Sequence, residues 1–444
     1  MLERLFELAA RNTNVRTEVL AGVTTFVTMA YIIFVQPAVL SAAGMEPGAV
    51  MVATCLASGL ATILMALLAN YPIAVAPAMG HNFFFAYTVV SAMKVPWQVA
   101  LGGVAVAGLI FILAAGIGLR ERVITAIPDS LKHAIAVGIG LLIAMLGLEW
   151  AGIIVAAPGT YVTLGDLRAR PTLVALVGVI VAAILVARRV RGALLGGMLA
   201  SAIVGLAVGV VRFHGVMSVP PSIAPTFMKL DVAGVFQPAM IPVVFVFFFL
   251  ALFDSVGTLV GVAGRAGLMK NGRLPRARGA LLADAIGTVA GAGLGTSTVT
   301  AYVESAAGVS AGGRTGLANI VTALLFFLSL FFHPLVQMVG EGVELTGAGA
   351  SPAVIHPVIA PALVLVGAMM LREVRHIDWE DPTESIPAFL TIVIMPLAVS
   401  ITDGIAFGFI AYALLKLAVG RGRDVDRLVY VFAALFLLRY AWLE

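Results

Sequence analysis

The sequence predicts a polytopic membrane protein made of α-helices. Of its 444 residues, 61% are hydrophobic and 11% are charged, and the mean hydropathy is +1.08. Soluble globular domains carry about 25% charged residues. Apolar stretches of about 17–25 residues, the length that crosses the hydrocarbon core of a bilayer, recur from Val19 to Val419. A transmembrane β-barrel would instead show alternating segments of about 10 residues.

Fourteen apolar segments are expected to cross the membrane. They lie near 18–40, 49–69, 73–91, 97–119, 130–148, 171–187 and 193–211, and then near 239–264, 278–293, 297–310, 316–338, 352–371, 385–402 and 405–420. A further apolar segment, 428–442, either spans the membrane or lies on its surface. Residues 1–17 mix both charge signs with Leu2, Leu5 and Phe6 at helical spacing, which predicts an amphipathic interfacial helix rather than a cleaved signal peptide.

The basic residues predict the orientation of these spans, because Lys and Arg collect in cytoplasmic loops. With the N-terminus in the cytoplasm, most of the 27 Lys and Arg residues fall in the even-numbered loops, as in 188–191 and 265–278. Topology therefore explains the excess of basic charge, and no nucleic-acid partner is expected. The tail after Gly420 is predicted to be cytoplasmic as well.

The two halves of the chain resemble each other. The segments GMLASAIVGLAVG (197–209) and GFIAYALLKLAVG (408–420) align without gaps, although apolar helices of low complexity also produce such matches by chance. Because seven is an odd number of spans, a second copy of a seven-span unit must enter the membrane in the opposite sense. Inverted repeats of this kind are typical of secondary transporters, whose site lies at the midplane between the repeats.

Two of the expected spans contain signals that interrupt a helix. In the third, NYPIAVAPAMGHNFFFAY, Pro72, Pro77 and Gly80 precede a helix-compatible run; in the tenth, GAGLGTSTVTAYVESAAG, Gly293 and Gly295 precede a patch of Thr, Ser and Val. Proline and glycine break helices, and β-branched residues favour extended backbone. We therefore predict short extended segments that break spans 3 and 10, each leading into a half-helix near the membrane centre.

Three carboxylates are expected inside the membrane rather than at its borders. They are Asp254, in the stretch FFLALFDSVGT, Asp284 and Glu304. A charged side chain at the centre of a transmembrane helix costs about 2.5–3.5 kcal/mol even on a lenient insertion scale, and such residues mark substrate and ion pathways. The alternative is a structural carboxylate that is hydrogen-bonded to neighbouring Ser and Thr residues.

Five segments together resemble one family of transporters. They are GVTTFVTMAYIIFVQPAVL, APAMGHNFFFAY, FFLALFDSVGTLVGVAGRAG, LLADAIGTVAGAGLGTSTVTAYVESAAG and IPAFLTIVIMPLAVSITDGIAFGF. They are similar to the azaguanine-sensitive purine permeases, the guanine, hypoxanthine and adenine branch of the nucleobase-cation symporter and nucleobase-ascorbate transporter superfamily. The resemblance implies fourteen spans in seven-plus-seven inverted repeats, with a core domain (spans 1–4 and 8–11) and a gate domain (spans 5–7 and 12–14).

In residue numbers, the resemblance divides the chain into six segments. They are an N-terminal interfacial segment (1–17), two halves of the core domain (18–119 and 239–340), two halves of the gate domain (130–213 and 352–420) and a C-terminal apolar segment (425–444). Alternating access would then come from movement of the core domain against the gate domain.

The resemblance also implies a substrate site built from spans 3, 8 and 10. By motif, the substrate-binding positions fall on Asn82, after Ala-Met-Gly, on Asp254 and on Glu304. In uracil-type relatives a histidine that takes part in proton coupling follows the span-8 acid by four residues, and here that position is Thr258. A coupling step that depends on that histidine is therefore not expected. His81 also departs from the apolar residue expected beside the asparagine.

Several other residues are candidates with a plain structural alternative. Phe84 and Phe253 could stack on a flat base, although phenylalanine in a membrane helix faces lipid by default. Thr25 and Thr298 could donate hydrogen bonds near the substrate or could simply pack helices together. Asp284 could take part in proton coupling with Asp254, Glu304 and Thr258, or could only fix helix packing. No cofactor and no metal ion are expected.

These observations predict a secondary active transporter that imports purine nucleobases by proton symport across the cytoplasmic membrane of a cell. The resemblance implies a homodimer. Coupling to sodium stays open, as does transport of xanthine, uracil or an anion by the same fold. The chain has no GxxxxGK[ST], HExxH or CxxC motif, so neither ATP-driven pumping nor an intramembrane enzyme is predicted. A cation channel is less favoured because selectivity filters use repeated rings of ligands.

Overall fold

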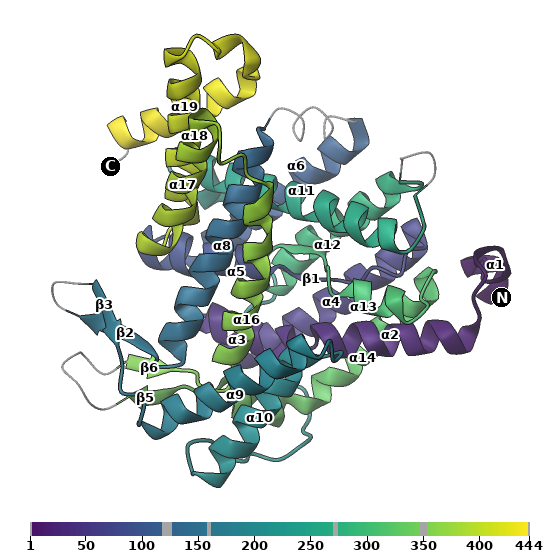
Figure 1. Ribbon diagram of the computed structural model, residues 1–444. Helices are drawn as coiled ribbons and strands as arrows, with labels where there is room; N and C mark the ends of the chain where they lie inside the picture. The colour runs from purple at the N-terminus through teal and green to yellow at the C-terminus, as the bar shows by residue number, and fades with distance from the viewer. Residues whose placement is uncertain (1, 118–126, 158–160, 270–273, 346–352, 443–444) are drawn as a thin grey trace.

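The computed structural model describes residues 2–117, 127–157, 161–269, 274–345 and 353–442 (Figure 1). Eight helical segments among them are long and apolar enough to cross a membrane. They are α2 with α3 (Val15–Met29 and Ile32–Ser41), α4 (Pro47–Ala69), α6 (Trp97–Ile117), α8 (Asp129–Trp150), α9 (Arg170–Ala187), α11 (Met240–Arg265), α14 with α15 (Gly316–Ser329 and His333–Gly340) and α18 (Ile401–Ala418). The prediction of a polytopic helical membrane protein is therefore confirmed.

Shorter helices lie where the remaining spans are predicted. These are α10 (Ala193–Ala207), α12 (Ala277–Leu294), α16 (Ala360–Met370) and α17 (Pro382–Leu397), with α19 (Arg427–Trp442) in the C-terminal apolar segment. Spans 3 and 10 are the predicted exceptions. Span 3 consists of β1 (Val75–Pro77), α5 (Met79–Phe83) and a π-helical segment (Phe84–Ala92), and span 10 consists of β4 (Val299–Ala301) and α13 (Ser305–Ser310).

Several predicted span boundaries are wrong. Span 1 is divided at Ala30 and Tyr31, and span 11 is divided by a 3-10 turn at Leu330–Phe332. Of the predicted 352–371, only the part from Ala360 onward is α-helix, because strand β6 (Ala353–Ile355) precedes it. The last span is predicted to begin at 405, but α18 begins four residues earlier, at Ile401. The Ser400 side chain caps this helix by accepting the Asp403 N–H at 3.2 Å. The preceding predicted span, 385–402, therefore extends too far. The predicted ends at 119 and 352 lie outside the described residues.

The two broken spans cross at a short antiparallel pair of strands. Val75 pairs with Ala301, Ala76 with Thr300 and Pro77 with Val299, so β1 and β4 run in opposite senses through the interior. All three residues of each strand are buried. This pairing joins segments more than 200 residues apart and places the first turns of α5 and α13 on either side of it.

A threonine from a neighbouring helix holds each of these strands in the same way. The Thr62 hydroxyl of α4 lies 3.0 Å from both the N–H and the carbonyl oxygen of Val75. The Thr288 hydroxyl of α12 accepts the N–H of Val299 at 3.3 Å and donates to its carbonyl at 2.9 Å. The two halves of the chain therefore repeat one local arrangement around the crossing, as expected for inverted repeats.

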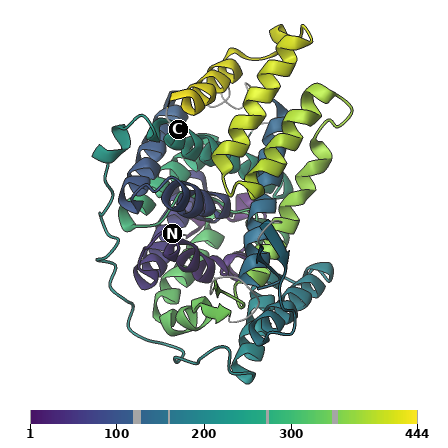
Figure 2. The same ribbon diagram turned by 90° about the vertical axis from the view of Figure 1, so that its left-hand side faces the viewer.

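The helices pack in two groups. In one, α4 packs against α12 and α14, α6 against α12, and α2 against α13 and α14; in the other, α8 packs against α16 and α17, α17 against α18, and α9 against α10. In the second group, a Cβ added at Gly367 of α16 would collide with the Gly140 carbonyl of α8. Small residues of this kind allow close helix packing in membranes. In Figure 2 the yellow-green C-terminal helices stand beside the blue α8.

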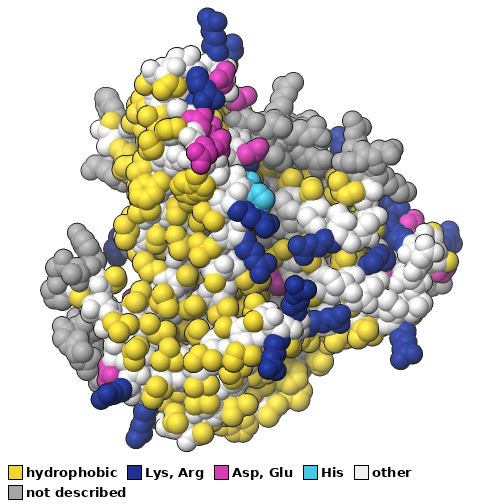
Figure 3. Space-filling view, in the orientation of Figure 1, with side chains coloured by type: hydrophobic (Ala, Val, Ile, Leu, Met, Phe, Trp, Pro, Cys, Tyr) yellow, Lys and Arg dark blue, Asp and Glu magenta, His cyan; other side chains and the backbone are white. Residues whose placement is uncertain are grey.

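The outer surface is largely apolar. Figure 3 shows a broad face of hydrophobic side chains with Lys and Arg gathered along its borders. Exposed large hydrophobic residues occur along many of the helices, for example Leu60, Leu113, Ile180, Ile203 and Leu414. Such an extended apolar surface is what a bilayer would cover. The N-terminal segment is attached to the helices, because Phe6 is buried and its carbonyl accepts a 2.9 Å hydrogen bond from Asn70 Nδ2.

Candidate functional site

Asn82 lies in the first turns after strand β1 and is fully buried. Its Oδ1 accepts a hydrogen bond from Ser297 Oγ, just before strand β4. Ser297 Oγ in turn accepts from Gln36 Nε2 of α3 at 3.2 Å, and the same amide donates to Thr296 Oγ1 at 2.9 Å. The Nδ2 group of Asn82 has no hydrogen-bond partner among the described residues. One face of the asparagine is therefore fixed, and its N–H donors are left for something else.

Glu304 immediately precedes α13 and is held by the break in the first span. The Tyr31 hydroxyl donates to Glu304 Oε1 at 2.7 Å, and Tyr31 itself is buried between α2 and α3. Thr28 Oγ1 lies 3.4 Å from the Glu304 carbonyl oxygen. Because Tyr31 fixes one carboxylate oxygen, the side chain is oriented and Oε2 is left as an acceptor.

Asp254 lies at the middle of α11, and its side chain is 49% exposed. Gly257 and Gly261, about one and two turns further along α11, have no atom within 4 Å of a Cβ that would be added there. This face of the helix is therefore open from Asp254 toward the C-terminal end of α11, with Thr258 partly exposed beside it. Asp254 also interacts electrostatically with Glu304. The structure thus brings the two predicted carboxylates near each other.

Asp284 and the two predicted threonines lie behind this group rather than on an open face. Asp284 is fully buried, and its Oδ2 accepts the Ala301 N–H at 3.3 Å, while Oδ1 has no partner among the described residues. The Thr298 carbonyl accepts the Ala78 N–H at 3.0 Å, and its hydroxyl is also without a partner within the described chain. Thr25 packs against Gly308 of α13, where an added Cβ would collide with its hydroxyl.

The two predicted aromatic residues have different surroundings. Phe84 is fully buried, and its ring meets the Phe247 ring edge-to-face at a centroid distance of 4.8 Å. Phe253 is partly exposed on α11 and stacks on Phe249 at 6.2 Å. Phe253 is next to Asp254 in sequence and has free ring surface, whereas Phe84 acts as packing in this conformation.

Unsatisfied polar atoms gather around the strand crossing. The described residues contain eleven buried side-chain nitrogen or oxygen atoms without a hydrogen-bond partner. Seven of them lie on elements that surround β1 and β4: Gln36 Oε1, His81 Nδ1 and Nε2, Asn82 Nδ2, Ser255 Oγ, Asp284 Oδ1 and Thr298 Oγ1. Of these, the Ser255 and Asp284 side chains lie close enough to interact with each other. Buried polar groups are normally paired, so such a concentration marks a place for a polar ligand or water. The group includes both donors and acceptors.

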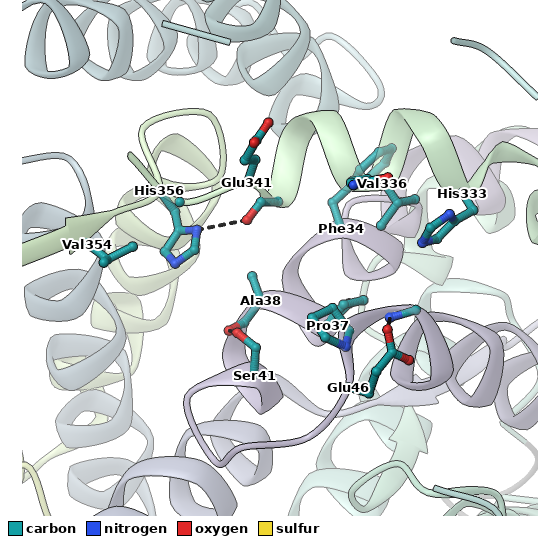
Figure 4. A pocket seen from close by; sticks show the side chains of 15 residues that line it. Phe34, Pro37, Ala38, Ser41, Glu46, His333, Val336, Glu341, Val354 and His356 are labelled. Carbon is teal, nitrogen blue, oxygen red and sulfur yellow. Dashed lines mark hydrogen bonds between the residues drawn. The ribbon is translucent and has the colours of Figure 1, made fainter. Parts of the chain in front are cut away.

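A cavity of about 490 Å³ lies elsewhere, between the C-terminal end of α3, the start of α4, α15 and the hairpin of β5 (Val343–Leu345) and β6 (Figure 4). His356 Nδ1 lies 3.0 Å from the Gly340 carbonyl oxygen on its wall. The Glu46 carboxylate accepts the N–H groups of Gly48 and Ala49 and so caps α4. None of the predicted site residues lines this cavity, and it is distinct from the strand crossing.

Sequence reasoning did not include Tyr31 or Gln36, which the structure adds to the group. Tyr31 holds Glu304, and Gln36 reaches Ser297 and thereby Asn82. The sequence feature that could have indicated Gln36 is a glutamine within the apolar stretch FVQPAV, because a buried amide needs hydrogen-bond partners. Among the described residues, no group of three or more His, Cys, Asp or Glu side chains is placed to hold a metal ion.

Comparison with known proteins gives concordant results. The sequence profile described as the permease family matches residues 16–407. The chain is 44% identical to the adenine permease AdeP of Escherichia coli, covering all of this chain and 97% of AdeP. It is 43% identical to the guanine/hypoxanthine permease PbuG of Bacillus subtilis over the full length of both.

A solved structure shows the same fold. The transmembrane domain of the cyanobacterial bicarbonate transporter BicA superposes with a TM-score of 0.65 at 17% identity, covering 88% of this chain and 97% of that domain. This similarity assigns the fold to the inverted-repeat class of transporters. With a profile match over most of its length and relatives above 40% identity, the chain belongs to the nucleobase-ascorbate transporter family of permeases and is a transporter rather than an enzyme.

Proposed function

We propose that the protein is a secondary active transporter that imports purine nucleobases, among them guanine, hypoxanthine and adenine, by proton symport. The observation that carries the proposal is the position of Asn82, Asp254 and Glu304 on α5, on α11 and at the start of α13. Helix α11 contacts α5, α13 and strand β4, and unpaired donors and acceptors lie on the elements around the β1–β4 crossing. The names of the relatives AdeP and PbuG, an adenine and a guanine/hypoxanthine permease, support the class of substrate.

Glu304 is the group that recognises the purine edge. Its Oε1 accepts from Tyr31, which holds the carboxylate in one orientation and leaves Oε2 to accept ring N–H groups of the base. Asn82 Nδ2 donates to a ring nitrogen or carbonyl oxygen, and Phe253 offers ring surface to the flat face of the base. A hydrogen bond to a charged group contributes about 1.5–3 kcal/mol, so Glu304 is the strongest single contact.

Proton coupling is assigned to Asp254. It is the most exposed of the three membrane carboxylates, and no atom lies within 4 Å of a Cβ added at Gly257 or Gly261 further along α11. A neutral purine needs no countercharge, so protonation of this carboxylate would let the loaded site cross the membrane without carrying a buried charge. Glu304, Asp284 and Thr258 complete the proposed coupling group, since the first two interact electrostatically with Asp254 and Thr258 lies one turn along α11. The proposed coupled ion is a proton rather than sodium.

Alternating access is proposed to follow from the two helix groups. The fourteen spans form seven-plus-seven inverted repeats: the core domain combines 18–119 with 239–340, and the gate domain combines 130–213 with 352–420. The packing of α4 with α12 and of α8 with α16 supports this division. The core domain, which carries Asn82, Asp254 and Glu304, moves against the gate domain. We propose that the protein lies in the cytoplasmic membrane as a homodimer, with its N-terminus in the cytoplasm. Residues 1–17 and 425–444 belong to neither domain in this division.

The test is the affinity of Glu304→Gln for two purines. Guanine presents two adjacent donors, N1–H and the amino group, whereas hypoxanthine presents N1–H alone on that edge. The substitution keeps the shape but turns an NH₂ group toward these donors. Guanine affinity should fall at least about tenfold, since each 1.4 kcal/mol is a factor of ten, and hypoxanthine affinity should fall less.

Isothermal titration calorimetry on purified protein measures both affinities. Glu344→Gln, an exposed residue on strand β5, is the matched control and should bind both purines like the parent. Unchanged guanine affinity in folded Glu304→Gln would reduce Glu304 to a structural carboxylate. Equal losses for both purines would keep Glu304 in the site but reject the contact with two donors.

A further inference from the structure

His81 occupies an unusual position for a histidine. It lies in α5, which packs against α11, its side chain is buried, and neither ring nitrogen has a hydrogen-bond partner among the described residues. Burying a polar ring without partners is unfavourable, so a residue of this kind is retained where a second state of the protein satisfies it.

Among the described residues, the carboxylate of Asp254 lies beside the His81 ring. His81 Nδ1 lies 3.7 Å from Asp254 Oδ2, just beyond hydrogen-bond distance. With the imidazole neutral and the carboxylate ionised, the pair carries one negative charge. Uptake of one proton makes the pair neutral overall and creates a charge-assisted hydrogen bond between Nδ1 and Oδ2, which is the stronger kind. A movement of about 0.8–1.0 Å would shorten this distance to the length of such a bond, about 2.7–2.9 Å.

The two members of the pair differ in their access to solution. Asp254 is 49% exposed on the open face of α11, and the His81 side chain is only 2% exposed. Other ionisable groups lie near Asp254: Glu304, Asp284 and Tyr302 each interact electrostatically with it. Helix α3, which also packs on α5, has no ionisable side chain, and α8 carries Asp129, Lys132, His133 and Glu149 only toward its two ends.

We infer that His81 and Asp254 together form the proton-carrying pair, with one proton shared between Nδ1 and Oδ2. The proton enters and leaves through Asp254, and His81 holds it inside the protein while the site changes sides. The proton taken from one solution is released to the other, so one positive charge moves with each neutral purine. This inference rests on the proposed function and adds to it a histidine on span 3.

Transport in proteoliposomes tests the inference with two separate readouts. Exchange of labelled hypoxanthine for unlabelled hypoxanthine at equal pH needs substrate binding and movement of the site, but no net proton transfer. Accumulation driven by an imposed pH gradient needs both. His81→Gln, which cannot carry a proton, should keep exchange and lose the gradient-driven accumulation. His376→Gln, an exposed histidine beyond α16, is the matched control and should keep both activities.

Each outcome separates the inference from the proposed function. Absence of hypoxanthine exchange in the parent protein would reject the proposed function itself. Gradient-driven accumulation by His81→Gln at the parental level would overturn the pair. Loss of exchange together with accumulation, with purine affinity reduced equally at every pH, would make His81 a purine-binding residue instead.

A second measurement follows the protonation of the His81 ring directly and needs no transport. In purified protein labelled with ¹⁵N-histidine, the His81 ring signals are assigned by their absence in His81→Gln, or by selective labelling if that variant does not fold. The pH dependence of these signals should shift when Asp254 is replaced in Asp254→Asn. Signals with the same pH dependence in both proteins would overturn the inference.

Discussion

At the scale of single residues, the unusual side chains of the membrane segments could be predicted and their partners could not. A carboxylate in an apolar run is conspicuous in sequence, and Asp254 and Glu304 do lie near each other. Tyr31 could not be predicted to hold Glu304, because tyrosine is common in membrane helices and its role depends on the break at Ala30.

Glu18 shows the same limit of the sequence. It lies at the start of span 1, where an acid at the membrane border attracts no attention. In the structure it is fully buried, and its carboxylate accepts the N–H groups of Arg314 at 2.9 Å and Thr315 at 3.3 Å, at the start of α14. The reason is an approach of two segments almost 300 residues apart, which no local pattern encodes.

A residue-scale prediction concerns Asp381, at the N-terminus of α17 and outside the membrane segments. Hydrogen bonds from the Thr383 hydroxyl (2.7 Å) and from Arg421 Nη1 (2.7 Å) hold the pKa of the Asp381 carboxyl well below its usual range. A lowered pKa in the folded protein means that the stabilisation is present above the ordinary aspartate pKa of about 3.9 and is lost as pH falls below it.

Asp381→Ala should therefore lower the thermal midpoint by a constant amount from pH 8 down to about 5, and the difference from the parent should shrink only at more acidic pH. Thermal unfolding of detergent-purified protein across this range is the measurement. Glu380→Gln, an exposed neighbour, serves as the control. A difference that grows as pH falls from 8 to 5 would be inconsistent with these hydrogen bonds.

At the scale of elements, the extended segments in spans 3 and 10 could be predicted, but their pairing could not. Proline, glycine and β-branched residues predict where the helices break, and β1 and β4 lie there. Antiparallel pairing across more than 200 residues leaves no short turn signal in the sequence, unlike a hairpin. The boundary between α17 and α18 was misplaced because the apolar run continues past Leu397 and hides the cap at Ser400.

The element-scale prediction concerns the threonines that hold the two strands. Thr62→Val and Thr288→Val each leave an N–H and a carbonyl group of a buried strand without the hydroxyl that binds them. An unsatisfied buried group costs about 1–3 kcal/mol, so each variant should be destabilised by an amount of that order. Thr62→Ser and Thr288→Ser keep the hydroxyl and should lose much less.

Thermal or denaturant unfolding of the four purified variants measures these effects. Because the two threonines make the same contacts in the two repeats, the valine variants should be destabilised to a similar degree. Parental stability in both valine variants would show that the strands do not depend on these hydroxyl groups.

At the scale of the whole molecule, three features agree with a membrane transporter: the strand crossing, the two helix groups and the apolar surface. The crossing is fixed to α4 and α12, which pack against each other, and α11 presents Asp254 on a face with no neighbouring atoms at Gly257 and Gly261. The same architecture occurs in a bicarbonate transporter, so the fold alone does not determine the cargo. We propose that the side chains at the crossing do, because two carboxylates disfavour an anion and suit the N–H edge of a base.

Uptake by proteoliposomes that contain only this protein tests the central claim most directly. With an inside-alkaline pH gradient, labelled hypoxanthine, guanine or adenine should accumulate above the external concentration, and a protonophore should abolish the accumulation. Unlabelled purines should compete, whereas uracil and bicarbonate should not. Accumulation that is the same with and without the pH gradient would contradict proton symport, and uptake of bicarbonate or uracil in place of purines would contradict the assignment of the site.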